Sequence, residues 1–138
     1  MKKKKKYQSS SHSKFLLKVH LIFVTKYRKK LLVARINDDM KQILFDIANE
    51  SDFKIETMQT DDGDHVHLLI DYPPTLSVSS IANRLKSMST VRIWRSGWGT
   101  FLRQRFWKEH TFWSDGYFAC STGDVSTEII QKYIEEQG

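Results

Sequence analysis

The sequence predicts an α+β fold in which helices cover one face of a four-stranded antiparallel sheet. Two patterns support this prediction. Short segments alternate apolar and polar residues, as half-buried strands do, and other segments carry apolar residues three and four positions apart, as helices do. The chain has 138 residues, of which 40% are hydrophobic and only two are prolines. This size and composition suit a single domain with one hydrophobic core.

The first strand is predicted from Lys14 to Tyr27, because every odd position from 15 to 23 is apolar. A helix follows, which we expect Asn37 or Asp38 to cap and which runs to about Asn49. The apolar residues of this helix form one stripe, made of Met40, Ile43, Leu44, Ile47 and Ala48.

The second and third strands are predicted to form a hairpin. Residues 53–60 alternate moderately well, residues 61–64 supply a turn, and a strand that begins at His65 follows. Ser77 then caps a second helix. The inward-facing residues of that helix are Val78, Ile81, Leu85 and Met88. Residues 96–112, rich in tryptophan and arginine, are expected to form a long connection with a short helix.

A last strand at residues 117–121 and a terminal helix at residues 129–137 complete the order. Thr122 and Gly123 break the strand, and Asp124 is a candidate cap for the helix. The order strand, helix, strand, strand, helix, strand builds a ferredoxin-like sheet, shared by RRM domains and several nucleases, with its first and third strands in the centre. The fold alone does not separate binding from cutting.

The net charge of +6 and the pI of about 9.4 indicate a polyanionic partner, with nucleic acid favoured over an acidic membrane. Five of the charges belong to Lys2–Lys6, in a basic arm of residues 1–13 that we expect to be disordered and to attract phosphates nonspecifically. Residues 14–138 then form the single domain. Without the five lysines the net charge falls to about +1, so the charge of the folded part is a weaker indication.

The sequence contains no candidate membrane span and no signal peptide. Cys120 is the only cysteine, which excludes an intrachain disulfide and a cysteine-based zinc site. We therefore expect a cytoplasmic protein.

The sequence His65-Val66-His67 is the most informative local motif. Residues i and i+2 of a strand point to the same side about 6.6 Å apart, so both imidazoles can reach one metal ion while Val66 faces the core. Such a pair alone is more often structural than metal-binding. At the far end of the chain, Tyr133 and Gln137 are spaced i, i+4 and share one face of the terminal helix. That helix would have to lie over the histidine face of the sheet, or over a partner's, to complete a site.

These residues suit cleavage of a phosphodiester. A tyrosine with a pKa of about 10 is a poor nucleophile at neutral pH unless a divalent cation lowers the charge barrier. Mixed imidazole and oxygen ligands favour Mg²⁺ or Mn²⁺ over a closed zinc site. Attack by Tyr133 would yield a covalent phosphotyrosine, whose reversal rejoins strands without ATP.

The chain resembles the single-tyrosine HUH transposases, the TnpA-type enzymes of the smallest bacterial insertion sequences. The resemblance spans nearly the whole chain, through the segments His20–Arg28, Met58–Thr60, Asp64–Leu69 and Gln131–Glu135. It implies that Tyr133 is the nucleophile and that Gln137 joins His65 and His67 as the third metal ligand.

The resemblance also implies a homodimer that binds hairpins in single-stranded DNA and cleaves and rejoins DNA through a 5′-phosphotyrosine. It further implies sites in which one subunit supplies the histidines and the other the tyrosine helix. Gly123 stands where a hinge would be needed, although an ordinary loop glycine fits equally well.

Basic and aromatic residues are candidates for DNA contact. The candidates for phosphate contact are Lys26, Arg28, Lys86, Arg92, Arg103, Arg105 and Lys108. The four tryptophans, Trp94, Trp98, Trp107 and Trp113, are expected in the core rather than stacked on bases. We interpret His20 as structural, and Asp61 and Asp64 either as turn residues or as groups that orient an imidazole.

Two other functions remain open at this stage. A domesticated relative acting on chromosomal repeat hairpins would use the same chemistry. A non-catalytic RRM-like module would bind nucleic acid through aromatic residues on its central strands, where this chain has histidines instead.

Overall fold

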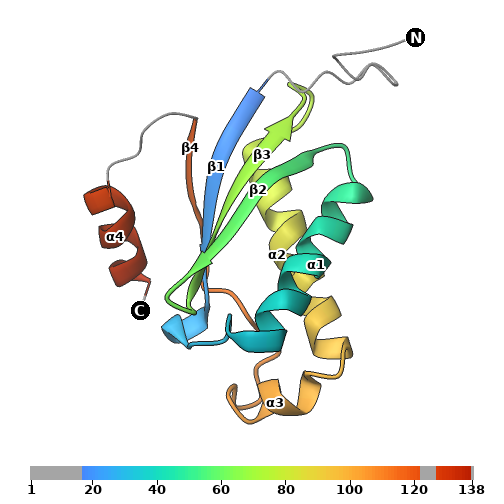
Figure 1. The fold of residues 1–138 in the computed structure, drawn as a ribbon, viewed down its shortest axis with the longest axis vertical. Helices are drawn as coiled ribbons and strands as arrows, with labels where there is room; N and C mark the ends of the chain where they lie inside the picture. Colours follow the sequence, from blue (N-terminus) through green and yellow to red (C-terminus); the bar gives the residue numbers. More distant parts are fainter. Residues whose placement is uncertain (1–16, 122–126, 138) are drawn as a thin grey trace.

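Four strands form one antiparallel sheet in the order β2-β3-β1-β4 (Figure 1). The computed structural model describes residues 17–121 and 127–137. The strands are β1 (Leu17–Val24), β2 (Lys54–Asp61), β3 (His65–Tyr72) and β4 (Phe118–Ser121). The helices are α1 (Ala34–Asn49), α2 (Val78–Arg95), α3 (Gly99–Arg103) and α4 (Thr127–Glu136), with a short 3-10 turn, η2 (Lys26–Arg28), after β1.

The two faces of the sheet are covered by different helices. Helices α1 and α2 lie on one face and α4 lies on the other (Figure 1). The side chains of β1 and β3 alternate accordingly. The main core, under α1 and α2, includes Val19, Leu21, Phe23, Val66, Leu68 and Ile70. Under α4, Ile22 and Val24 of β1 pack against Ile134 in a second, smaller cluster.

The predicted α+β, ferredoxin-like order with an added C-terminal helix is confirmed, and β1 and β3 are the central strands as predicted. The cap of α2 is also confirmed, because the Ser77 hydroxyl accepts a hydrogen bond from the backbone N–H of Ser80 at 3.1 Å. The expected short helix in the tryptophan-rich connection is α3. None of the described helices has the length and apolar character needed to span a membrane.

The predicted start of α1 is wrong. The helix begins at Ala34 rather than after Asn37 or Asp38, and its N-cap, Val33, makes no side-chain hydrogen bond. Ile36, in the first turn of the helix, is buried in the main core. This burial stabilises the turn although no side chain caps it. The predicted arm of residues 1–13, the first residues of the predicted first strand, and Gly123 and Asp124 lie outside the described residues.

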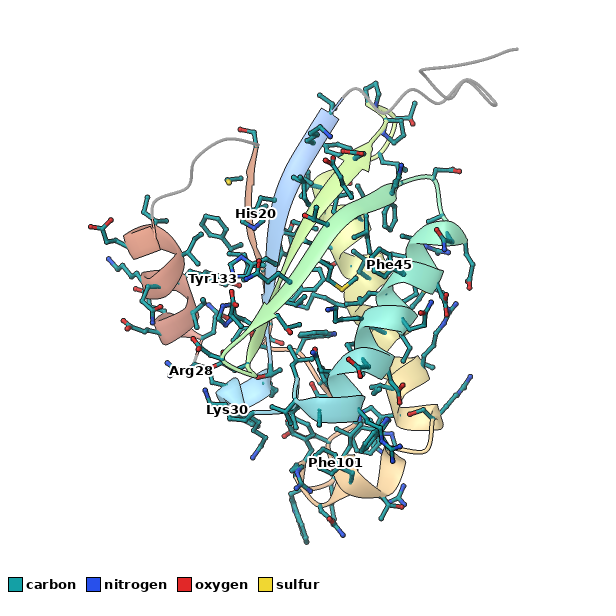
Figure 2. All side chains as sticks on the ribbon, in the orientation of Figure 1. His20, Arg28, Lys30, Phe45, Phe101 and Tyr133 are labelled. Carbon is teal, nitrogen blue, oxygen red and sulfur yellow. The ribbon has the colours of Figure 1, made fainter. Side chains whose placement is uncertain are left out.

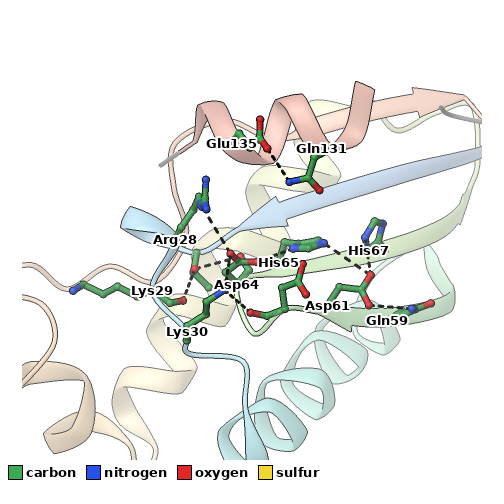
Figure 3. A network of polar contacts seen from close by, with 12 residues as sticks. Arg28, Lys29, Lys30, Gln59, Asp61, Asp64, His65, His67, Gln131 and Glu135 are labelled. Carbon is green, nitrogen blue, oxygen red and sulfur yellow. Dashed lines mark hydrogen bonds and ion pairs between the residues drawn. The ribbon is translucent and has the colours of Figure 1, made fainter. Parts of the chain in front are cut away.

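The turn η2 reverses the chain directly after β1. Tyr27 and Arg28 both have left-handed backbone conformations, with φ of 59° and 51°. Such values are uncommon outside glycine and mark a constrained position. The buried Thr25 hydroxyl donates a 2.7 Å hydrogen bond to the carbonyl of Lys29, which closes the turn. The turn thereby places Arg28 and Lys30 beside the start of β3 (Figure 3).

Candidate active site

His65 and His67 lie on the face of β3 that is turned away from the main core, as the alternation predicts. Their ring centroids are 5.0 Å apart. Val66, between them, is buried on the opposite face. Because β3 is hydrogen-bonded to β2 on one side and β1 on the other, both imidazoles stand on rigid backbone.

Each imidazole is oriented by a partner on its Nδ1 atom. His65 donates from Nδ1 to Asp64 Oδ1 at 2.8 Å. His67 Nδ1 lies 3.2 Å from His20 Nε2, in a hydrogen bond that either nitrogen can donate. Both Nε2 atoms then face Asp61 Oδ2, at 3.9 Å from His65 and 3.2 Å from His67 (Figure 3).

This arrangement fits a divalent cation. The ligand atoms of Asp61, His65 and His67 all lie within 4.8 Å of one another. His67 and Asp61 line an open cavity of about 420 Å³, together with His20, Thr57, Met58, Gln59 and Leu69. Desolvation lowers the pKa of His67, helped by the neighbouring His65, and so favours the neutral imidazole that binds metals. Of the two interpretations of Asp61, a turn residue or a group that orients an imidazole, its contact with both Nε2 atoms favours the second.

Asp64 is the buried anchor of the site. Its side chain is 4% exposed, and it joins His65 to two basic residues. Lys30 Nζ lies 3.4 Å and Arg28 Nε 3.8 Å from its Oδ2 atom, whereas Oδ1 accepts from His65. A carboxylate behind a metal-binding imidazole fixes the ring and its tautomer. Asp64 therefore holds His65 with Nε2 directed into the site.

Tyr133 extends from α4 toward the sheet face that carries the histidines (Figure 2). Its ring packs on the second cluster and contacts Phe118, with ring centroids 5.6 Å apart. The hydroxyl is buried and has no hydrogen-bond partner among the described residues. Desolvation raises the pKa of Tyr133 to about 12. The phenol is thus neutral, and its oxygen is free of competing hydrogen bonds.

Gln137 follows α4 one turn after Tyr133. Its Oε1 atom accepts a hydrogen bond from the Ser114 hydroxyl at 3.2 Å. The Ser114 backbone N–H donates to the carbonyl of Val24, which pairs with His65 across β1 and β3. The end of α4 is therefore tied to the part of the sheet where His65 stands. The oxygen that faces both imidazoles in this structure nevertheless belongs to Asp61.

The predicted phosphate-binding residues fall into separate groups. Lys26 and Arg28 belong to η2, with Arg28 Nε 3.8 Å from Asp64, the residue before His65, and Lys26 Nζ 3.9 Å from Asp115. Lys86 Nζ instead donates to the carbonyls of Ser114 and Gly116, at 2.8 and 2.6 Å. Burial lowers the pKa of Lys86. Lys86 therefore braces the loop before β4.

The other predicted basic residues lie away from the histidines. Arg92 forms a bidentate pair with Glu50, in the helix layer on the opposite face of the sheet. Arg103 and Arg105, in and just after α3, are exposed. Lys108 lies over the ring of Trp107.

The expectation that all four tryptophans belong to the core is wrong for Trp107. Trp113 is buried, and Trp94 and Trp98 are partly buried against the core, but Trp107 is 81% exposed. The neighbouring Phe106 takes the buried place in this loop. The sequence pattern of this irregular segment does not show which of the two rings points inward.

His20, which the sequence predicts to be structural rather than a ligand, contacts His67 directly. Its side chain shares the α4 face of the sheet with Ile22, and its neighbour across β1 and β3 is Leu69. The signal in the sequence was that His20 is even-numbered in a strand whose odd positions are apolar. Recognising the contact also requires the register between β1 and β3.

Residues 13–137 match the family described as Transposase IS200 like. The ISDra2 transposase TnpA of Deinococcus radiodurans is 32% identical over 123 residues, which cover 89% of this chain and 85% of the relative. The transposase for insertion sequence element IS200 of Salmonella typhimurium is 28% identical over 131 residues, which cover 94% of this chain and 82% of the relative.

Two solved structures are similar in fold. A crystal structure of a Deinococcus radiodurans protein assigned as a transposase matches with a TM-score of 0.79 and 30% identity, over 96% of this chain and 97% of that one. A REP-associated tyrosine transposase bound to a REP hairpin matches with a TM-score of 0.55 and 10% identity, over 98% of this chain and 68% of that one.

Proposed function

This chain belongs to the IS200-like transposase family, and we propose that Tyr133 is the nucleophile with which it cleaves and rejoins single-stranded DNA. One observation carries the proposal: Tyr133 packs on the same face of the sheet as the paired imidazoles of His65 and His67. The family match favours an enzyme over an RRM-like binding module.

In the proposed reaction, the Tyr133 oxygen attacks the phosphorus of the scissile phosphodiester. The phenolic proton is lost, and the 3′ oxygen of the neighbouring nucleotide leaves and takes up a proton. The products are a 5′-phosphotyrosine and a free 3′ hydroxyl. Attack by another 3′ hydroxyl on this ester restores the phosphodiester and the phenol, so the bond is conserved.

His65 and His67 would hold the cation, Mg²⁺ or Mn²⁺, with Gln137 as a further oxygen donor from the terminal helix. When bound, the cation polarises the scissile phosphate and offsets the charge that develops on its oxygens. The buried Asp64 keeps His65 directed at this position. Because the phenol has a pKa of about 12, the neutral tyrosine is the resting form.

The DNA is proposed to reach the site past the basic turn η2. Lys26 and Arg28 lie there, with Arg28 beside Asp64, whereas Arg103 and Arg105 are exposed in and just after α3. The substrate is proposed to be a hairpin in single-stranded DNA; the REP-associated tyrosine transposase of similar fold is bound to a REP hairpin. The active unit is proposed to be a homodimer in which one subunit can supply the tyrosine helix to the other.

The test is covalent capture of labelled single-stranded hairpin DNA with Mg²⁺, followed by denaturing electrophoresis. The unmodified chain should form a protein-linked product, and Tyr133→Phe should form none. Tyr117→Phe, a change at a partly buried tyrosine packed on the main core, serves as the control and should retain the product. A covalent product with Tyr133→Phe would exclude Tyr133 as the nucleophile. Formation of the product in the presence of a chelator would show that cleavage needs no divalent cation.

A further inference from the structure

We propose that the exposed ring of Trp107, with Tyr27 as its neighbour, is a stacking site for unpaired bases of single-stranded DNA. The phosphates next to these bases would lie against Lys29 and Lys108. The inference rests on the proposed function in taking DNA as the ligand. It goes further by naming a surface that distinguishes unpaired from paired DNA.

Two aromatic rings are exposed where the fold does not require them. Among the phenylalanine, tyrosine and tryptophan side chains that the structure describes, Tyr27 and Trp107 are the exposed ones, at 53% and 81%. A single exposed ring is common on protein surfaces and needs no explanation. Two such rings on adjoining turns are a pattern, and exposed aromatic rings are the groups on which unpaired bases stack.

The turn η2 and the loop of residues 106–109 are held against each other. The buried ring of Phe106 lies 6.4 Å from the ring of Tyr27, between centroids. The Tyr27 hydroxyl donates to Glu109 at 3.1 Å. Lys29 Nζ lies 5.9 Å from the ring centroid of Tyr27 and 5.7 Å from that of Phe106. Because these contacts lie on both sides of Trp107 in the sequence, its ring and that of Tyr27 share one surface.

The backbone of these turns favours a role for their side chains. Tyr27, Arg28 and Lys108 have φ values of 59°, 51° and 57°, in the left-handed region. Glycine adopts such values without the steric cost that a side chain brings. Three large side chains at such positions indicate that the side chains themselves, and not only the turns, are used.

The basic charge of the folded part is concentrated on the same surface. Residues 26–30 and 103–109 contain one acidic residue, Glu109, and seven basic ones, Lys26, Arg28, Lys29, Lys30, Arg103, Arg105 and Lys108. Without Lys2–Lys6 the net charge is about +1, so the rest of the chain is net acidic. Within the described residues, four of the seven form no ion pair: Lys29, Arg103, Arg105 and Lys108. Their charge is available for phosphates.

This surface continues from the candidate active site. Val24, the last residue of β1, pairs with His65, and the backbone N–H of Thr25 donates to the carbonyl of Asp64 at 2.9 Å. The turn η2 follows at once, and it lies with α3 at the end of the molecule where β3 begins (Figure 1). A DNA strand with one phosphate at the histidines can therefore extend onto the exposed rings.

The chemistry of the surface favours unpaired over paired bases. Inside a duplex both faces of a base are already stacked, so a ring that projects from a protein surface finds no free face there. Lys108 Nζ lies 5.4 Å from the ring centroid of Trp107 and so places a cation beside the stacking position. A stacked base and its own phosphate would be bound together.

The experiment compares two DNA ligands in fluorescence anisotropy, with the full chain and a chelator to prevent cleavage. One ligand is an oligothymidine and the other a blunt duplex of the same length. Trp107→Leu should weaken binding of the oligothymidine at least about fivefold and leave duplex binding within about twofold. Trp107→Phe keeps an aromatic face and should stay within about threefold for the oligothymidine.

The matched control is Val91→Ala, which changes an exposed apolar residue on α2 and should leave both affinities unchanged. A melting curve checks that each variant is folded. A crosslinking measurement then locates the site directly. 5-Iodouracil, placed at one unpaired position beside a hairpin stem, crosslinks to nearby aromatic side chains under ultraviolet light. Mass spectrometry should find the crosslink on Trp107 or Tyr27.

Three results would overturn the inference: unchanged oligothymidine affinity in Trp107→Leu, equal losses for both DNA ligands, or a loss in Trp107→Phe as large as that in Trp107→Leu. Covalent capture of DNA by Tyr133 separates the inference from the proposed function. A chain that captures DNA but binds oligothymidine normally as Trp107→Leu retains the function and loses the stacking site. A chain that shows the stacking pattern but never captures DNA retains the stacking site and loses the function.

Discussion

Removal of the Tyr133 hydroxyl is expected to stabilise the protein while it abolishes covalent attachment to DNA. The hydroxyl is buried without a hydrogen-bond partner among the described residues, whereas the ring packs on Phe118 and the second cluster. Tyr133→Phe keeps the ring and removes the buried polar atom. An uncompensated buried hydroxyl costs about 1–3 kcal/mol on scales derived from protein mutations. Because the ring is only half-buried, we expect a gain of about 1 kcal/mol.

For a chain of 138 residues this gain corresponds to a rise of about 3–5 °C in melting temperature. Circular dichroism at pH 7 measures it. The matched control is Tyr27→Phe, which removes a hydroxyl that donates to Glu109 at 3.1 Å and should lower the melting temperature slightly. If Tyr133→Phe lowers the melting temperature as well, the hydroxyl has a partner in solution and the reasoning fails.

The same hydroxyl predicts a pH dependence. The folded-state pKa of about 12 lies above the ordinary value of 10.0, so the unfolded chain releases this proton first. Below pH 10 the phenol is protonated in both the folded and the unfolded chain, so its titration does not affect the free energy of unfolding. As the pH rises from 10 toward 12, the unfolded chain loses the proton while the folded chain keeps it, and the free energy of unfolding falls. Tyr133→Phe lacks this loss. The difference in unfolding free energy between the variant and the unmodified protein should therefore widen from pH 8 to pH 10.5 in urea titrations.

Three further predictions concern the surroundings of the site. Asp64→Asn should weaken Mn²⁺ binding by about 10–100-fold in calorimetry, because His65 loses its orienting carboxylate; unchanged affinity would exclude this role. Lys86→Ala should lower the melting temperature without changing the salt dependence of DNA binding, because Lys86 braces the loop before β4. Arg103→Ala should instead reduce the slope of log K against log salt by about one, as loss of one phosphate contact does. The reverse result would make Lys86 the phosphate-binding residue and Arg103 the structural one. Trp107→Ala should weaken single-stranded DNA binding by about 1–3 kcal/mol with no change in melting temperature, since its ring is exposed; equal affinity would leave that ring without a role in binding.

Patterns confined to one element were predictable from the sequence. The alternation around His65 and His67 placed both imidazoles on one face of a strand, and the structure confirms this placement. The Ser77 cap was equally readable, because a serine before an apolar stripe at helical spacing satisfies a local rule. The i, i+4 spacing of Tyr133 and Gln137 predicts that both share one face of the terminal helix, and in the structure Tyr133 packs on the second cluster while Gln137 accepts a hydrogen bond from Ser114.

Features that depend on pairing between segments were not predictable in the same way. The contact between His20 and His67 and the position of Asp61 opposite His65 follow from strand register, which one sequence does not fix. The first turn of α1 is not predictable from a capping rule, because no side chain caps it and burial of Ile36 in the main core stabilises it instead. In the segment around Trp107, two adjacent aromatic residues compete for one buried place, and only the folded chain decides between them.

The two halves of the candidate site differ in how firmly they are attached to the molecule. The histidine strand is the second of four and is bonded along both edges, so its amide protons should exchange with deuterium only through global opening. Helix α4 packs on the sheet through the small second cluster and the hydrogen bond between Ser114 and Gln137, with no strand pairing, so we expect it to open locally. Mild denaturant should therefore release the helix that carries Tyr133 first and leave the strand that carries His65 and His67 in place, so the two halves of the candidate site can separate before the fold is lost.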